Sequence, residues 1–305
     1  MVDREPARAA RLLDAQAKAE RLFTAIEERG LVAPGERERA VSDRIRDLAN
    51  ELFGTTRHWH KRIVRSGPNT LLPYRENPPD RVIATDDIVF ADFGPIFEEY
   101  EADFGRTFVF GDDPVKHRLC DDLPRVFRAG KRHFESDPDI TGHELYAEVE
   151  RLAAEVGWEL GGWHAGHLVG EFHHEKIDGA EPESYIAPAN DTPLRRNDKA
   201  GRRCHWIVEI HLVNREHGFG GFYEELLTLG CDEQAELIDK RSTFPISWCR
   251  EALVEPFPAP PGLATAGWQR SAVPATAQTA RRQQLDRPVH PFRQRGRPAC
   301  SRSSS

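Results

Sequence analysis

Two acidic residues in the N-terminal half have the surroundings expected of ligands for a divalent cation. Asp92 ends the apolar run IVFAD, and Asp103 follows eleven residues later, where the chain returns as RTFVFG. A hairpin of this length brings the two carboxylates face to face, and they repel each other unless one is protonated or a cation lies between them. A solvated acidic loop is the alternative, because the same connection also contains Glu98, Glu99 and Glu101.

Three further candidates lie in the C-terminal half. His167 lies in the small-residue motif GHLVG, where backbone can approach a ligand, and Glu209 interrupts the apolar run WIVEIHLV. An acid is costly to bury in such a strand unless it is paired or binds a metal. The run GFYEELLTL contains Glu224 and Glu225, and strand alternation points only one of them inward. Four carboxylates and one imidazole suit two divalent cations such as Mn(II), Co(II) or Zn(II), which can share a water and lower its pKa.

Composition limits the classes of protein to which this chain can belong. Its 305 residues are 39% hydrophobic, which is enough for one large domain or two small ones. Residues 262–305 hold eight Arg, one Asp and no Lys, so the net charge of −8 divides into +7 there and −15 elsewhere. The acidic part is a poor candidate for binding nucleic acid. The sequence predicts no membrane span and no signal peptide, and five scattered cysteines without a CxxC pair indicate a reduced, cytoplasmic protein.

The elements that must position the candidate ligands follow from hydrophobic periodicity. It predicts helices over 6–29, 36–53, 114–132 and 142–157, with Thr141 as an N-cap. It predicts strands over 88–94, 106–111, 205–213 and 221–229, which form two hairpins. Each half therefore has helices and a hairpin, which indicates an α+β domain built from two similar halves.

In order and spacing, these residues resemble the pita-bread metallopeptidases, which include methionine aminopeptidase, aminopeptidase P, prolidase and creatinase. The stretch DFGPIFEEYEADFGRT resembles the family's first signature, and GHLVG matches its G-H-x-x-G motif. The family's second His, usually followed by Glu, matches His174, and its last two ligands match Glu209 and Glu224. The SGPNT stretch at 66–70 is most similar to the Xaa-Pro peptidase branch.

The resemblance covers about residues 13–229 and implies a fold and a domain organisation. We expect a pita-bread catalytic domain over 1–229, with two similar αβ halves around a curved antiparallel sheet. A C-terminal extension would follow over 230–253. Residues 254–305, rich in Pro, Arg and Ser, are predicted to be a disordered tail that is dispensable for hydrolysis.

The resemblance also implies a dinuclear metal centre. Asp92 would bind one metal, Asp103 and Glu224 would bridge both, and His167 and Glu209 would complete the other, with manganese or cobalt favoured over zinc. The implied reaction is hydrolysis of an N-terminal, Xaa-Pro type bond of a small peptide by a metal-bridging hydroxide. In that reaction Glu209 would shuttle the proton, and His174 would stabilise the carbonyl oxygen as the tetrahedral intermediate forms. The family is also compatible with a homodimer.

One departure from the family pattern concerns the substrate. The family has a His 17–18 residues before the first Asp, and Tyr74 stands at that place here. We take Tyr74, His60 in RHWHKR, and His211, on the same strand face as Glu209, as candidate substrate-binding residues. A creatinase-like or other non-peptide reaction is one alternative function. A non-catalytic binding module is another, although such modules typically lose ligands and none is lost here.

Overall fold

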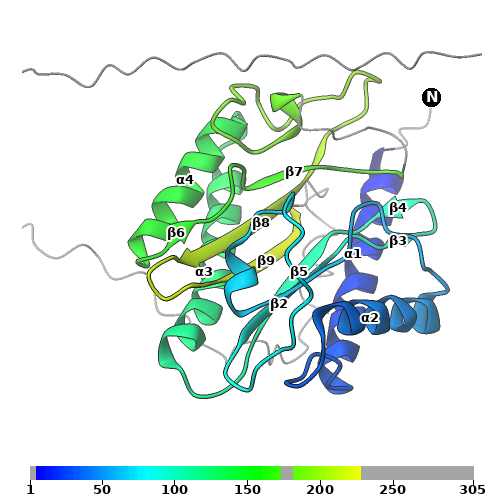
Figure 1. The fold of residues 1–305 in the computed structure, drawn as a ribbon. Coiled ribbons are helices and arrows are strands. Elements are labelled where there is room, and N and C mark those ends of the chain that lie inside the picture. Colours follow the sequence, from blue (N-terminus) through cyan, green and yellow to red (C-terminus); the bar gives the residue numbers. More distant parts are fainter. Residues whose placement is uncertain (1–4, 173–180, 228–305) are drawn as a thin grey trace, which may run out of the picture. The chain divides into compact units, whose positions relative to one another are not determined.

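The computed structural model describes residues 5–172 and 181–227, which form an antiparallel sheet with helices packed against it (Figure 1). The helices are α1 (Glu5–Glu28), α2 (Glu38–Phe53), α3 (Pro114–Ser136) and α4 (Gly142–Glu155), with two short 3-10 helices, η1 (Gly67–Leu71) and η2 (Pro182–Ser184). The strands are β1 (Ile63–Ser66), β2 (Ile88–Phe93), β3 (Ile96–Phe97), β4 (Tyr100–Glu101), β5 (Phe104–Val109), β6 (Glu159–Leu160), β7 (Gly166–Val169), β8 (His205–Asn214) and β9 (Phe219–Leu227).

The expected helices and hairpins are present, with shifts of a few residues at their ends. The largest shift is in α3, which continues to Ser136. Thr141 is the N-cap of α4, where it forms a reciprocal capping box with Glu144. The sequence did not predict β6 or β7, and the expected tail over 254–305 lies outside the described residues.

The two hairpins share one sheet. Its strand order is β1-β2-β5-β9-β8-β6, and β7 also pairs with β8. The hairpin of β2 and β5 joins the hairpin of β8 and β9 where Gly105 lies opposite Glu224. Because two helices precede each hairpin, the molecule has two similar halves, as predicted from the sequence.

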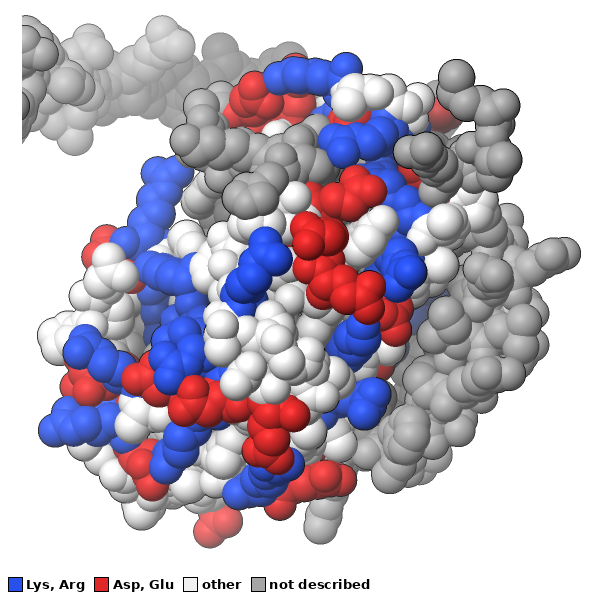
Figure 2. Space-filling view, turned by 90° about the vertical axis from the view of Figure 1, so that its right-hand side faces the viewer, with Lys and Arg blue, Asp and Glu red and all other residues white. Residues whose placement is uncertain are grey.

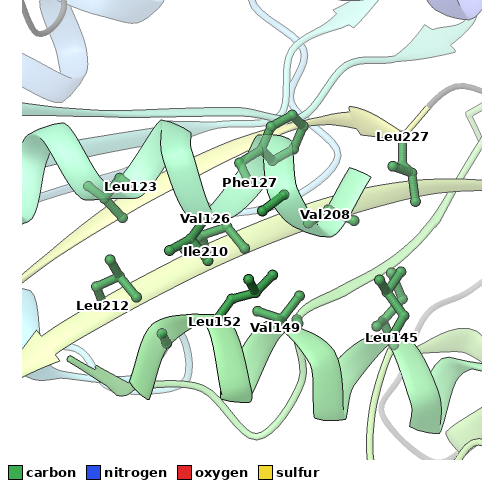
Figure 3. Close-up of a cluster of buried hydrophobic side chains, with 14 of the residues drawn as sticks. Leu123, Val126, Phe127, Leu145, Val149, Leu152, Val208, Ile210, Leu212 and Leu227 are labelled. Carbon is green, nitrogen blue, oxygen red and sulfur yellow. The ribbon is translucent and has the colours of Figure 1, made fainter. Parts of the chain in front are cut away.

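One face of the sheet carries the apolar core. Side chains of β8 pack against α3 and α4 in the C-terminal half, as Figure 3 shows. The labelled core residues are Leu123, Val126, Phe127, Leu145, Val149, Leu152, Val208, Ile210, Leu212 and Leu227. In the N-terminal half, α1 and α2 share a second buried cluster with Val89, Ala91 and Phe104. Strand alternation points the intervening residues of β2, β8 and β9 away from these helices.

The surface is of mixed charge where Figure 2 shows it. Lys and Arg side chains are interspersed with Asp and Glu side chains over that face. Among the helices of the described residues, none combines the length and the apolarity needed to cross a membrane.

Candidate metal centre

The strands bring the five predicted metal ligands to the sheet face opposite the helices. Glu209 of β8 and Glu224 of β9 lie directly opposite each other in the strand register. Asp92 lies near the end of β2, and Asp103 comes immediately before β5. His167 of β7 pairs with Ile207, two residues before Glu209. Residues from both hairpins therefore meet where the two halves join.

These carboxylates are buried, unlike those of a solvated acidic loop. Asp103 is 2% exposed and Glu224 is 1% exposed. Glu98 and Glu99, from the connection between β2 and β5, are exposed instead. Glu225 points to the helix face, where it binds the Arg106 guanidinium. Alternation thus places only Glu224 of the Glu224–Glu225 pair in the cluster.

Asp103 lies between two imidazoles. Its Oδ1 is 2.9 Å from Nε2 of His60, and its Oδ2 is 3.2 Å from Nε2 of His167. The same nitrogen of His60 is 3.6 Å from Asp92 Oδ1, and that of His167 is 3.9 Å from Glu224 Oε1. The described residues therefore contain two groups of donors close enough to hold a cation, and Asp103 belongs to both.

Burial and crowding of like charges shift the ionisation of these groups. Burial and the neighbouring carboxylates raise the pKa of Asp92 to about 7 and raise the pKa of Glu224 well above its usual range. Burial opposes protonation of His60 and His167, but the nearby carboxylates outweigh it and raise the pKa of each to about 9. Burial would also raise the pKa of Asp103, but the two imidazoles lower it below its usual range. Without a cation, the cluster is stabilised by binding protons.

The donor set fits a divalent-metal centre. Oε2 of Glu224 is buried, and it has no hydrogen-bond partner among the residues that the structure describes. A buried, unpaired carboxylate oxygen is costly unless the group is protonated or a cation compensates it. Carboxylate oxygens and imidazole nitrogens together suit Mn(II), Co(II) and Zn(II).

Two glycines allow the close approaches that position the histidines. A Cβ at Gly166, where φ is +140°, would lie 2.0 Å from the Ile207 carbonyl oxygen. Only glycine therefore lets β7 approach β8 with His167 directed at the cluster. A Cβ at Gly94 would lie 2.1 Å from Cδ2 of His60 and 2.4 Å from Nε1 of Trp59. Trp59 is held by a 3.0 Å hydrogen bond from Nε1 to the Ala102 carbonyl.

The three candidate substrate-binding residues lie in different surroundings. His60 lies inside the carboxylate cluster, and the ring of Tyr74, which is 48% exposed, lies 6.1 Å from the His60 ring. His211 donates from Nε2 to the Thr70 carbonyl at 2.8 Å and packs between Phe90 and Phe222. His174, the predicted oxyanion-stabilising residue, lies outside the described residues.

Sequence reasoning did not assign a role to His164. Its Nδ1 contacts Oε1 of Glu209, and this contact lowers the pKa of Glu209 although burial opposes the change. The only sequence signal was its place in GGWHAGH, three residues before His167. Its contact with Glu209 depends on the pairing of β7 with β8.

A helix-covered antiparallel sheet made of two similar halves, with buried carboxylates and imidazoles on its open face, defines a pita-bread protein. The model of metallopeptidase family M24 matches residues 10–199, and because this is well over half of the sequence, the chain belongs to that family.

Comparison with individual proteins gives partial alignments. The chain is 31% identical over 156 residues to Xaa-Pro dipeptidases of Pyrococcus horikoshii and Pyrococcus furiosus. These alignments cover 50% of the chain and 42% and 43% of the relatives, so the chain matches less than half of their length.

Solved structures show the same fold. An X-Pro aminopeptidase from Thermotoga maritima superposes with a TM-score of 0.58 at 22% identity, over 73% of this chain and 61% of that chain. A methionine aminopeptidase from Rickettsia prowazekii superposes with a TM-score of 0.54 at 16% identity, over 72% of this chain and 96% of that chain. The match to the methionine aminopeptidase covers nearly all of that chain.

Proposed function

We propose that this protein is a peptidase that uses two divalent cations to hydrolyse the N-terminal bond of small peptides, of the Xaa-Pro type. The buried cluster around Asp103, with the unpaired Oε2 of Glu224, carries the proposal. Membership in family M24 supports metal-dependent hydrolysis, and the relatives named Xaa-Pro dipeptidase support the substrate class.

In the proposed reaction, separate residues bind the metals, transfer the proton and stabilise the carbonyl oxygen. When bound, the two cations would supply a water activated for attack and would neutralise charge that develops on the carbonyl oxygen. Asp92, Asp103, His167, Glu209 and Glu224 would hold them. Glu209 takes the proton of the attacking water and passes it to the leaving amine, because its side chain is 15% exposed and the other carboxylates are less accessible. His174 would donate a hydrogen bond to the carbonyl oxygen.

Kinetics on matched peptides test this proposal. Purified protein should cleave Xaa-Pro peptides faster than Xaa-Ala peptides after addition of Mn(II) or Co(II). Asp103→Ala and Glu224→Gln should each lower kcat/KM by about 10³-fold or more, because several kcal/mol of transition-state stabilisation depend on the cations.

Glu225→Gln is the matched control, because Glu225 is adjacent in sequence but faces the helices, and glutamine keeps an acceptor for Arg106. This variant should hydrolyse the peptides at the wild-type rate. Hydrolysis at the wild-type rate by both Asp103→Ala and Glu224→Gln would show that the cluster does not catalyse the reaction.

A non-peptide, creatinase-like C–N hydrolysis is the second candidate, and Tyr74 at the place of the family's histidine is the observation that favours it. A panel of non-peptide amides, assayed with the same metals, separates the two reactions. Turnover of such an amide without cleavage of any peptide would favour the second candidate. A metal content below about one ion per chain after loading would instead favour a binding module.

A further inference from the structure

His60 belongs to the carboxylate cluster although it comes from a segment well before the hairpin that carries the two aspartates. Its Nε2 lies 2.9 Å from Asp103 Oδ1 and 3.6 Å from Asp92 Oδ1. The His60 side chain is only 7% exposed, and its contact with Asp103 is direct. His60, Asp92 and Asp103 form one of the two donor groups of the site.

The other ring nitrogen of His60 is already occupied by a hydrogen bond. Nδ1 lies 2.7 Å from the carbonyl oxygen of Lys61. A carbonyl oxygen only accepts hydrogen bonds, so Nδ1 keeps its hydrogen, and Nε2 is the nitrogen that would give up its proton and offer a lone pair to a cation. A cation between these three donors would make the arrangement favourable.

His167 has the same arrangement on the other side of Asp103. Its Nδ1 donates to the Leu168 carbonyl at 2.9 Å, while its Nε2 faces Asp103 Oδ2 at 3.2 Å. In both rings, Nδ1 is bound by the carbonyl of the next residue and Nε2 is directed at one oxygen of the shared aspartate. A ligating histidine in proteins commonly donates its second ring N–H to such a backbone carbonyl.

We propose that His60 is a direct ligand of the cation on the Asp92 side of the centre. Each cation would then have one imidazole, and the two would share Asp103. This inference rests on the proposed metal centre and adds a sixth donor to the five predicted ones. Imidazole ligands suit zinc and other late first-row metals, whereas carboxylate ligands suit manganese. We therefore expect the Asp92-side position to prefer Co(II) or Zn(II) to Mn(II).

The packing around His60 holds the ring in this orientation. Gly94 leaves the space that the ring occupies, and Trp59 and Tyr74 contact it edge to face, with ring centroids 4.6 Å and 6.1 Å away. The backbone N–H of Lys61 donates to the Tyr74 hydroxyl at 3.3 Å. Tyr74 thus packs against the proposed ligand from the solvent side.

A spectrum of the wild-type protein loaded with two Co(II) ions tests the inference without any substitution. Proton NMR should show two strongly shifted, solvent-exchangeable imidazole N–H signals, from Nδ1 of His60 and of His167. Both signals should vanish in D₂O. Two bound Co(II) ions with only one such signal would overturn the inference.

Metal titrations of variants give a second test. Loss of an outer-shell partner typically costs 10- to 100-fold in metal affinity, so loss of a direct ligand in His60→Ala or His60→Gln should weaken one of two Co(II) sites by more than about 100-fold. His58→Ala is the control, because His58 packs against Phe93 and contacts none of the carboxylates among its described interactions. A folded His60→Ala protein that binds both ions as tightly as the wild type would disprove the inference, and the NMR result decides if this variant does not fold.

Peptide assays keep this inference separate from the proposed function. Two Co(II) ions and two imidazole signals without peptide cleavage would leave the His60 assignment intact and refute the peptidase proposal. Peptide cleavage with a single imidazole signal would support the peptidase proposal and refute the His60 assignment.

Discussion

His58 and His60 are two residues apart, and their different neighbours give them opposite ionisation behaviour. Burial lowers the pKa of His58 to about 4, and the nearby positive charges of Arg62 and His60 add to this effect. Asp103 and Asp92 instead raise the pKa of His60 to about 9 against the effect of burial. The same residue type therefore stays neutral at one position and holds a proton or a cation at the other.

The depressed pKa of His58 predicts a loss of stability in mild acid. The unfolded chain binds a proton at His58 near pH 6.5 while the folded protein does so only near pH 4, so lowering the pH between these values favours unfolding. The free energy of unfolding of His58→Phe should therefore fall less than that of the wild type between pH 6.5 and pH 4. Urea unfolding at several pH values measures this difference.

An exposed histidine serves as the control for this measurement. His117→Phe makes the same substitution at the solvent-exposed start of α3 and controls for the effect of the substitution itself. Parallel curves for His58→Phe and the wild type would contradict the assignment of His58 as a buried neutral ring.

At the scale of elements, strand β2 and the segment before β1 approach each other at Gly94. The close approach puts the His60 ring beside the end of β2, so a side chain at residue 94 and the ring cannot both fit. The family signature D-x-G thus has a packing reason in this chain, because the glycine makes room for a donor from another segment.

Gly94→Ala should therefore weaken metal binding while leaving the fold intact. The added methyl group must displace His60 or Trp59, and displacement of a positioned donor should lower metal affinity by about 10- to 100-fold. Gly130→Ala is the control. Gly130 lies inside α3, and a Cβ there would meet Val149 of α4 at 3.3 Å. Equal Co(II) affinity in the two variants would show that the approach at Gly94 does not position the site.

At the scale of the whole molecule, the candidate ligands connect the two halves. Asp92 and Asp103 come from the N-terminal hairpin, whereas Glu209 and Glu224 come from the C-terminal one. The repulsion among these four carboxylates across the junction of β5 and β9 must be offset by bound protons or by a cation. Metal binding should therefore stabilise the folded state as a whole.

Removal of metal with a chelator should lower the melting temperature, and its return should restore it. A free metal concentration 100 times Kd stabilises the folded state by about 2.7 kcal/mol, which corresponds to roughly 5–10 °C for a domain of this size. Differential scanning calorimetry measures the shift. Glu224→Gln should show a much smaller metal-dependent shift, and a shift equal to that of the wild type would place the cation elsewhere.

The local elements of this protein could be read from the sequence. Hydrophobic periodicity depends only on near neighbours, so it located the four long helices and both hairpins. Alternation within β9 likewise predicted that only one of Glu224 and Glu225 points inward, and the family motif selected Glu224. Strand β7 was not predicted, because its glycines and His167 carry no strand pattern and its pairing with β8 is a long-range contact.

The sequence by itself determined the fold class, the two-half organisation and five candidate ligands, because each depends on short-range patterns or on motifs with fixed spacing. Only the tertiary structure decided that His60 lies between Asp92 and Asp103 and that His164 contacts Glu209. His60 and Asp103 are 43 residues apart, and no local pattern links them. Their contact follows from the burial of the helices and hairpins against one another, and this burial brings the distant donors into one small volume.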